Sequence, residues 1–431
     1  MERTVYEDFR WLLGDSAQTL LVAAQEAFVD QVNAISIAKR LRKQTTAARA
    51  AMVMEQAQLR IRGREKFAFA DQMYFTRRGF EQATGAELAV YKASRFADCD
   101  RVADICCGLG GDLIALASRP GSSGSSSEST TVGVDSDDVT ALFAARNLEV
   151  HLNGQQDSGI QQAKGRKNWV QRTTFEKLNL SEFDGLHLDP DRRTERRTVH
   201  GNRFSPSLEE VYTITCPKQM ISIKVAPATP VDDYFPQQLY REWIGDRREC
   251  KQQLLWSGGE CARLCEMFGS RTATVVLGDQ VHQFSVREDQ VDVRAGVVEQ
   301  AQKYLYEPHA TVLAARLTDA MAVQYGARRS ASDIPYLFSE EPIEHPLLSG
   351  FRVVSVMPMD MKVIMKSLNK YDLGRLEIKR RGIDNITAAK FAKFKTKGSI
   401  SATLILARVG KQDKRKAILA KRISKAKVSG S

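Results

Sequence analysis

The sequence lacks the segments that would place the protein in or across a membrane. No window holds the roughly 20 consecutive apolar residues that a membrane-spanning helix needs. The first residues, MERTVYEDFRWLLGDS, are acidic and do not show the basic and then apolar pattern of a secretory signal. We therefore expect a cytoplasmic protein with no membrane partner.

Cysteine and histidine are too few and too scattered to predict a metal site. The seven cysteines form no CxxC pair, and the six histidines do not supply a matching set of ligands. An odd number of cysteines without an export signal is typical of a protein with reduced, mostly buried thiols. We expect neither a metal ion nor a disulfide framework.

Positive charge is concentrated at one end of the chain. Residues 351–431 contain 21 Lys and Arg but 5 Asp and Glu, whereas the first 350 residues contain 42 against 47. A basic module beside a mildly acidic body indicates a polyanionic partner, most simply nucleic acid. The alternative is a solvated basic surface followed by a frayed basic tail, KRISKAKVSGS.

The spacing of apolar residues divides the chain into three regions. Residues 1–95 have apolar positions at helical spacing and predict a helical N-terminal domain, with one helix over residues 81–96. Residues 96–299 alternate short apolar runs with helical patterns, which predicts an α/β, Rossmann-like domain with a parallel sheet. Residues 300–431 predict a small basic α+β domain with a basic tail. The serine-rich run over residues 119–131 is expected to be a flexible insertion.

A glycine-rich loop follows the first predicted strand, RVADICC. The loop runs GLGGD from Gly108, and a third glycine of the dinucleotide-binding pattern would fall on Leu113. S-adenosylmethionine fits better, because Asp104 can lie near its cationic end and Asp135 can accept both ribose hydroxyls. The alternative is a turn with a structural role alone.

The adenine of such a cofactor should lie near the end of the third strand. Glu176 is the candidate acceptor for its amino group, with Asn179 as a rival and a solvated acid as the alternative. The predicted cofactor-binding residues are Asp104, Cys106, Gly108, Gly110, Asp112, Asp135, Ser136 and Glu176.

The fourth predicted strand ends in the unusual stretch GLHLDPDRRT. Pro190 stiffens this turn and can hold Asp189 towards the cofactor, where a carboxylate can receive a proton from an attacking amine. The arginines suit phosphate or carboxylate groups. The alternative is a strand-end turn closed by a local ion pair of Asp191 with Arg193. The predicted catalytic residues are Asp189, Pro190, Asp191 and Arg192, and the predicted substrate-binding residues near them are Arg193 and Lys224.

At these residues the sequence resembles a known family. ADICCGLGGD, VGVDSDD and LHLDPDRR are similar to class I S-adenosylmethionine-dependent methyltransferases, and YLYEPH, GRLEIKRRGID and ATLILARVG resemble a bacterial subgroup with a C-terminal THUMP-like domain. The resemblance implies RNA binding by the basic domain, with Lys379, Arg380 and Arg381 contacting phosphates. The sequence departs from enzymes that methylate base amines, because Asp191-Arg192 replaces their proline and aromatic residue.

Three functions are compatible with these features. The leading hypothesis is a methyltransferase that acts on ribosomal or transfer RNA, with the basic C-terminal domain binding the RNA. The second is a methyltransferase for a small molecule or a protein, and the third is a non-catalytic protein that binds S-adenosylmethionine and RNA. The sequence sets no oligomeric state.

Overall fold

The computed structural model describes residues 3–119, 129–157, 167–192, 204–214, 219–231, 239–258, 261–383 and 398–423. The chain divides into two compact units. The first comprises Met1–Tyr240 and Leu254–Arg263, and the second comprises Arg241–Gln253 and Leu264–Ser431. The serine-rich insertion therefore lies largely outside the described residues.

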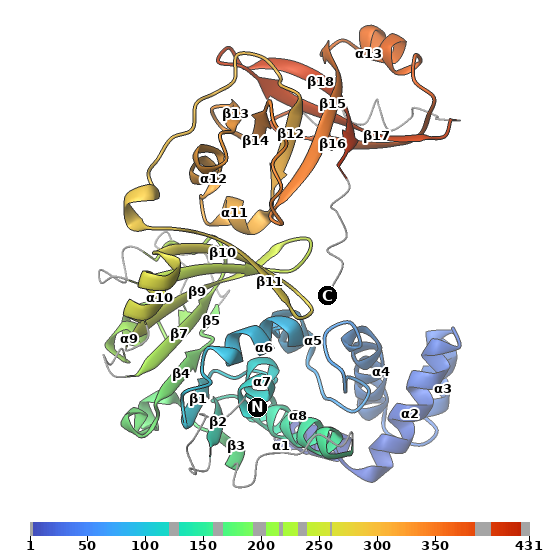
Figure 1. The fold of residues 1–431 in the computed structure, drawn as a ribbon. Helices are drawn as coiled ribbons and strands as arrows, with labels where there is room; N and C mark the ends of the chain where they lie inside the picture. The colour runs from blue at the N-terminus through green and yellow to red at the C-terminus, as the bar shows by residue number, and fades with distance from the viewer. Residues whose placement is uncertain are drawn as a thin grey trace. The chain divides into compact units, whose positions relative to one another are not determined.

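The first unit begins with helices, as the sequence predicts (Figure 1). Polar side chains start several of them: the Asn33 side chain accepts a hydrogen bond from Ile35 N, and the Thr46 side chain accepts one from Arg49 N. The helices are α1 (Arg3–Leu12), α2 (Asp15–Val29), α3 (Ala34–Leu41), α4 (Ala47–Gly63), α5 (Arg77–Gln82) and α6 (Ala86–Ser94).

One helix of the prediction is two helices in the structure. The segment 81–96 was expected to be continuous, but α5 ends at Gln82 and α6 begins at Ala86. Gly85 adopts an extended backbone at the start of α6, and the chain between the two helices brings Thr84 against the α/β core. The break therefore supplies a side chain to the candidate site.

A parallel sheet follows the helices. Its strands in this unit are β1 (Arg101–Ile105), β2 (Thr130–Asp135), β3 (Lys167–Arg172), β4 (Gly185–Leu188) and β7 (Met220–Val225). They lie in the order β7-β4-β1-β2-β3, and each pair of neighbours is parallel. Because β1 has later strands on both sides, the strand order reverses beside it, which is where open α/β sheets bind ligands.

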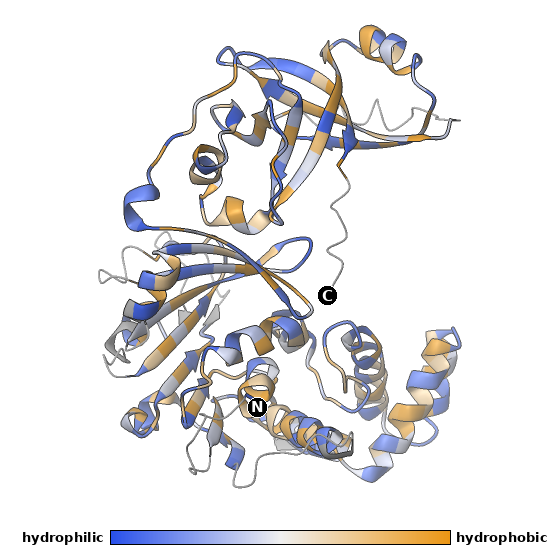
Figure 2. Ribbon diagram, viewed as in Figure 1, coloured by the Kyte–Doolittle hydropathy of each residue, from blue (hydrophilic) through white to orange (hydrophobic). Residues whose placement is uncertain are grey.

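Helices cover both faces of this sheet. On one face, α7 (Gly111–Ala117) and α8 (Asp138–Asp157) share a buried apolar core with the N-terminal helices. On the other face, Leu208 and Val211 of α9 (Leu208–Ile214) pack with Ile105. Figure 2 shows hydrophobic and hydrophilic residues alternating along the helices of this unit, as expected for helices with one buried face.

The second unit contains two groups of strands. In the first group, β10 pairs with β8 in parallel and with β11 in antiparallel orientation. This part of the chain comprises β8 (Tyr240–Gly245), β9 (Cys250–Gly258), which spans the division between the units, α10 (Cys261–Phe268), β10 (Arg271–Leu277) and β11 (Gln280–Val286).

A seven-stranded sheet forms the rest of the second unit, in the order β13-β14-β12-β15-β18-β17-β16. Its elements are β12 (Tyr304–Pro308), α11 (Ala310–Ala314), α12 (Thr318–Gln324), β13 (Arg328–Ala331), β14 (Ile334–Ser339), β15 (Leu348–Pro358), α13 (Met361–Leu368), β16 (Leu373–Arg380), β17 (Ile400–Val409) and β18 (Lys414–Arg422). Residues 384–397, between β16 and β17, lie outside the described residues.

One strand near the end of the chain was not predicted from the sequence, which placed a basic tail from Lys421 onward. The segment KRKAILAKR forms β18, an internal strand of the sheet whose four central residues, Ala417–Ala420, are buried. Basic residues at both ends of this strand make its composition look like that of a tail. Residues 424–431 of the predicted tail lie outside the described residues.

Candidate active site

The glycine loop leaves β1 through three residues with a left-handed backbone. Cys106, Gly108 and Gly110 have φ angles of 59°, 56° and 87°. Such a φ is uncommon for cysteine, so the loop is strained at Cys106. A side chain built on Gly108 would meet no atom within 4 Å, and one on Gly110 would meet none closer than 3.7 Å. The backbone therefore borders open space at Gly108, whereas Gly110 lies against Ala144 and Leu113.

Asp135, at the end of β2, lies against this loop. Gly108 N donates a hydrogen bond to Asp135 Oδ2 at 3.1 Å, and Asp137 N donates one to Oδ1 at 3.0 Å. Asp135 is partly exposed, and Ser136 beside it is exposed. The structure thus brings together the loop and the strand-end acid that the sequence pairs.

Asn147 of α8 ties the loop to the chain that precedes the sheet. Its Oδ1 accepts a hydrogen bond from Tyr74 N at 2.6 Å, and its Nδ2 donates to Tyr74 O at 2.9 Å and to Leu109 O at 3.0 Å. Asn147 is fully buried. The sequence analysis assigned it no role, although a polar residue within the apolar pattern of a predicted helix is a signal for one.

Asp112, predicted to bind the cofactor, has partners inside the protein. Lys92 Nζ forms an ion pair with its Oδ1 at 2.6 Å, and Thr84 Oγ1 donates a hydrogen bond to its Oδ2 at 2.8 Å. His187 Nε2 lies 3.4 Å from Oδ2. Burial alone would raise the pKa of Asp112, but Lys92 and His187 hold this pKa well below its ordinary value. Asp112 is therefore a buried carboxylate.

Burial lowers the pKa of both basic residues beside Asp112, Lys92 and His187. Burial lowers the pKa of Lys92 despite its contact with Asp112. Burial, followed by repulsion from Lys92, lowers the pKa of His187, whose Nδ1 is hydrogen-bonded to Ser222 Oγ at 2.6 Å. His187 is therefore a neutral interior histidine.

Asp104 of β1 is buried without a hydrogen-bond partner among the described residues. Its side chain is fully inaccessible, and neither carboxylate oxygen has a partner. Burial, followed by repulsion from Asp112 and Asp189, raises the pKa of Asp104 well above its ordinary value. Burial therefore favours the protonated form of the acid that the sequence places near the cofactor's cationic end.

Asp189 follows β4 and forms an ion pair with Lys224 of β7. Lys224 Nζ lies 2.6 Å from Asp189 Oδ2 and 3.3 Å from Gln82 O. Burial would lower the pKa of Lys224, but attraction to Asp189 and Asp112 raises it overall, so the lysine is charged. Asp189 is 32% exposed, and Pro190 behind it is buried. Lys224, predicted to bind substrate, thus contacts the predicted catalytic acid.

The remaining predicted residues of the first unit lie elsewhere or are not described. Asp191 and Arg192 form the short strand β5 (Asp191–Arg192), which pairs with β6 (Phe204–Ser205), and their side chains are outside the described residues. Arg193 is outside the described residues altogether. Glu176 lies in a 3₁₀ turn, η1 (Phe175–Lys177), and is exposed; a hydrogen bond with the Thr174 side chain lowers its pKa.

The predicted phosphate-contacting residues of the second unit differ in their surroundings. Lys379 Nζ lies 2.7 Å from Glu307 Oε2, and Arg381 Nη2 lies 3.5 Å from Glu307 Oε1. Arg380, between them in sequence, is exposed. Glu307 therefore offsets the charge of two of the three residues.

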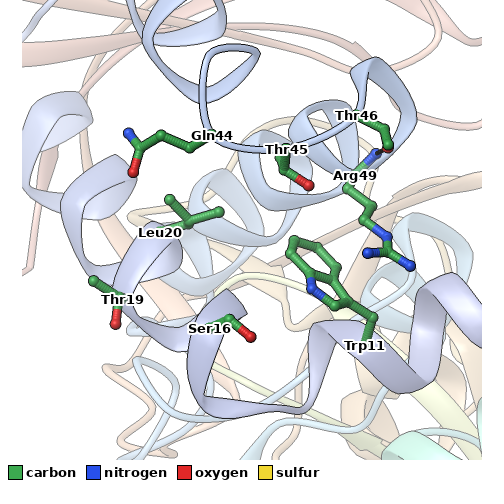
Figure 3. Close-up of a pocket in the computed structure, with 8 residues that line it drawn as sticks. All are labelled: Trp11, Ser16, Thr19, Leu20, Gln44, Thr45, Thr46 and Arg49. Carbon is green, nitrogen blue, oxygen red and sulfur yellow. Dashed lines mark hydrogen bonds between the residues drawn. The ribbon is translucent and has the colours of Figure 1, made fainter.

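A hollow of 680 Å³ lies among the N-terminal helices (Figure 3). Arg49 forms one wall, where its guanidinium lies 4.7 Å from the centre of the Trp11 ring and Arg49 Nε lies 2.7 Å from Asp8 Oδ1. The lining contains no acid and no histidine, so it offers no general base. The lining residues are Trp11, Ser16, Thr19, Leu20, Gln44, Thr45, Thr46 and Arg49.

The described part of the chain contains no group of three or more His, Cys, Asp or Glu residues placed to hold a metal ion. None of its helices has the length and apolar character needed to cross a membrane.

Two segments of the chain match families of known domains. Residues 348–422 match the THUMP domain-like family, and residues 6–63 match the family described as Domain of unknown function (DUF8688). No curated protein matches the sequence. The THUMP-like match covers β15 to β18, the basic part of the second unit.

The fold of the chain is similar to that of solved structures. A protein described as a methyltransferase, from Porphyromonas gingivalis W83, is similar over 98% of this chain and 99% of its own, with a TM-score of 0.68 and 18% identity. An RNA methyltransferase from Salinibacter ruber, in complex with S-adenosylhomocysteine, is similar over 39% of this chain and 89% of its own, with a TM-score of 0.25 and 13% identity. The predicted fold is confirmed: the chain has a helical N-terminus, a Rossmann-like methyltransferase α/β fold and a THUMP-like domain.

Proposed function

We propose that the chain is an S-adenosylmethionine-dependent methyltransferase that acts on RNA. The observation that carries the proposal is the junction of the glycine loop with Asp135. It combines a hydrogen bond of 3.1 Å from Gly108 N, open space in front of Gly108, and a position beside β1 where the strand order reverses.

The residues at this junction fit S-adenosylmethionine. Asp135 has two carboxylate oxygens, one against Gly108 N and one against Asp137 N, and a pair of acceptor oxygens suits the two hydroxyls of a ribose. The backbone at Gly108 leaves room for the amino-acid part, and Asp104 is a buried acid without a hydrogen-bond partner among the described residues. The cofactor supplies an activated methyl group when it is bound. The described similarity to the Porphyromonas gingivalis protein supports the same class of reaction.

Asp189 is the proposed proton acceptor. Methyl transfer is an in-line displacement, so the protein mainly positions the attacking lone pair and removes its proton. Lys224, at 2.6 Å, orients the Asp189 carboxylate, while partial exposure leaves it accessible to a substrate. Buried Pro190 fixes the backbone that follows.

RNA as the substrate is supported by the second unit. Arg352 of β15 and Lys421 of β18 are exposed and directly opposite each other in the antiparallel register. Like charges opposite each other destabilise a sheet, so their placement favours a polyanionic ligand over a purely structural role. The match to the THUMP domain-like family and exposed Arg380 point to the same partner.

The test is transfer of a labelled methyl group to total RNA from a strain that lacks the protein. We expect label in one RNA species, with at least about a hundredfold loss for Asp189→Ala, the size typical of a lost general base. Asp98→Ala changes an exposed acid outside the candidate site and should keep the wild-type rate. Label in no RNA species would contradict RNA as the substrate, and equal rates for Asp189→Ala would remove that residue from its role.

A further inference from the structure

Ionisable side chains from five segments of the first unit gather beneath the glycine loop. They come from α6, β1, α7, the end of β4, and β7, and each of them is buried or mostly buried. The group, here called the buried charge cluster, consists of Lys92, Asp104, Asp112, His187, Asp189 and Lys224. It contains three acids and two lysines beside a neutral histidine, so one acid lacks a matching positive charge.

The distances identify that acid. Lys92 Nζ lies 2.6 Å from Asp112 Oδ1, and Lys224 Nζ lies 2.6 Å from Asp189 Oδ2, so each lysine has its own carboxylate. Asp104, in contrast, has no hydrogen-bond partner for either oxygen among the described residues. A buried carboxylate without a partner is strongly disfavoured in its charged form. Asp104 therefore carries a proton when nothing else is bound.

The charged groups that act on Asp104 come from α6, α7, β7 and the end of β4, whereas neighbouring β2 places Gly133 beside it. Asp112 on α7 and Asp189 after β4 disfavour the ionisation of Asp104. Lys92 on α6 and Lys224 on β7 favour its ionisation, but burial opposes ionisation more strongly than either lysine favours it. The neighbouring thiol of Cys107 is uncharged, because burial and Asp104 raise its pKa. A cation that entered beside Asp104 would supply the missing charge.

We propose that the ammonium group of the bound cofactor takes the place of the Asp104 proton. The inference rests on the proposed function, because it requires the glycine loop to bind S-adenosylmethionine. On binding, the O–H bond of the Asp104 carboxyl group breaks, the proton passes to the solvent, and the carboxylate faces the ammonium. No covalent bond to the cofactor forms or breaks in this step.

The displaced proton makes cofactor affinity depend on pH. Since the cofactor favours the unprotonated form of Asp104, the dissociation constant should fall by up to about tenfold for each unit of pH while the free protein holds the proton. Above that range the affinity should become independent of this group. S-adenosylhomocysteine keeps the ammonium but lacks the sulfonium charge, and 5′-methylthioadenosine lacks both, so the pair separates the contribution of the ammonium.

The experiment is calorimetric titration of the full chain with S-adenosylhomocysteine at slightly acidic pH, in two buffers with different enthalpies of ionisation. We expect a difference in heat that corresponds to release of about one proton per ligand bound. Asp104→Asn should bind with no proton release, 5′-methylthioadenosine should release none, and Asp98→Asn should behave like the wild type. An infrared difference spectrum of the wild type should show loss of a protonated-carboxyl band on binding, a readout that does not depend on any variant folding.

The outcomes separate this inference from the proposed function. Binding heat that is the same in both buffers would overturn the proton displacement while leaving cofactor binding intact. Equal proton release by Asp104→Asn would also overturn it, since the proton would come from another group. No binding heat for either S-adenosylhomocysteine or S-adenosylmethionine would contradict the proposed function itself, and the inference with it.

Discussion

At the scale of single residues, the position of the glycine loop depends on one buried amide. Asn147 satisfies the N–H and the carbonyl of Tyr74 and the carbonyl of Leu109 with a single side chain. These main-chain groups are far from water, so an alternative partner would have to come from the protein. The loop is therefore held by α8 as well as by the strand that precedes it.

Asn147→Ala should lower the free energy of unfolding by about 3 kcal/mol or more, because each buried polar group left without a partner costs about 1–3 kcal/mol. Urea unfolding measures the change, and calorimetry should show weaker binding of S-adenosylhomocysteine at the same time. Asn153→Ala, at an exposed position of the same helix, is the matched control and should change stability by less than about 0.5 kcal/mol. Equal stability of the two variants would show that the Asn147 hydrogen bonds carry little energy.

Asp104 makes stability depend on pH in a predictable direction. Its pKa is raised in the folded protein, so above the ordinary value of 3.8 the unfolded chain loses this proton first. Stability from this group is therefore full below pH 3.8 and falls as pH rises towards the folded pKa, by at most about 1.4 kcal/mol per unit. Asp104→Asn should remove this loss, so the variant should gain stability relative to the wild type as pH rises. Parallel unfolding profiles for the two proteins would contradict the assignment.

At the scale of elements, the seven-stranded sheet is curled so that non-neighbouring strands interact. Glu307 of β12 pairs with Lys379 of β16, although β15, β18 and β17 separate these strands in the sheet. The core inside the curl contains residues from both halves, including Leu305 and Ile405. The ion pair therefore links the edge strand β16 to the middle of the sheet.

Glu307→Gln should destabilise the chain by about 1–3 kcal/mol, because it removes the charged hydrogen-bond acceptor of Lys379 and the ion-pair partner of Arg381. Thermal or urea unfolding at neutral pH measures the effect. Glu344→Gln, at an exposed position of the same unit, should leave stability nearly unchanged and serves as the control. A loss no greater than that of the control would show that the curl does not need this pair.

Elements defined by local patterns could be predicted from the sequence, and those defined by distant partners could not. The runs before Gly108 and Asp189 predicted strands because a buried parallel strand is continuously apolar and ends at a turn. β18 was missed because basic residues flank its four apolar residues, so the segment has the composition of a basic tail. The residues that pair with it lie in β15 and β17, which no local pattern shows. The break at Gly85 was missed because one glycine is compatible with a continuous helix.

The candidate site follows the same division. Gly108, Gly110 and Asp135 could be identified because a loop and a strand end have recognisable spacing, and the structure brings them together. The pairing of Lys92 with Asp112, by contrast, joins α6 to α7 through side-chain contacts that no local pattern encodes. The role of Lys224 beside Asp189 depends on β4 and β7 being neighbours in the sheet.

At the scale of the whole molecule, the uneven charge should govern affinity for RNA. If Arg352 and Lys421 each contact a phosphate, Arg352→Gln and Lys421→Gln should each weaken binding and reduce the slope of log affinity against log salt by about 0.7, the value for one contact to a single strand. Fluorescence anisotropy with labelled RNA over a series of salt concentrations measures both effects.

Lys39→Gln, at an exposed position of α3, removes the same charge from the first unit and should leave the salt slope unchanged. Since Arg352 and Lys421 repel each other across β15 and β18, their replacement should not lower stability. Salt slopes that are equal for all three variants would contradict an RNA-binding role for this surface.

The most direct test of the account is a crystal structure of the protein grown with S-adenosylhomocysteine. We expect the ligand at the carboxyl ends of β1 and β2, with its ribose hydroxyls on the Asp135 carboxylate and its amino-acid part along the backbone of Gly108–Gly110. Ligand bound by other side chains, away from this loop, would contradict the central claim that the junction of the glycine loop with Asp135 is the methyl-donor site.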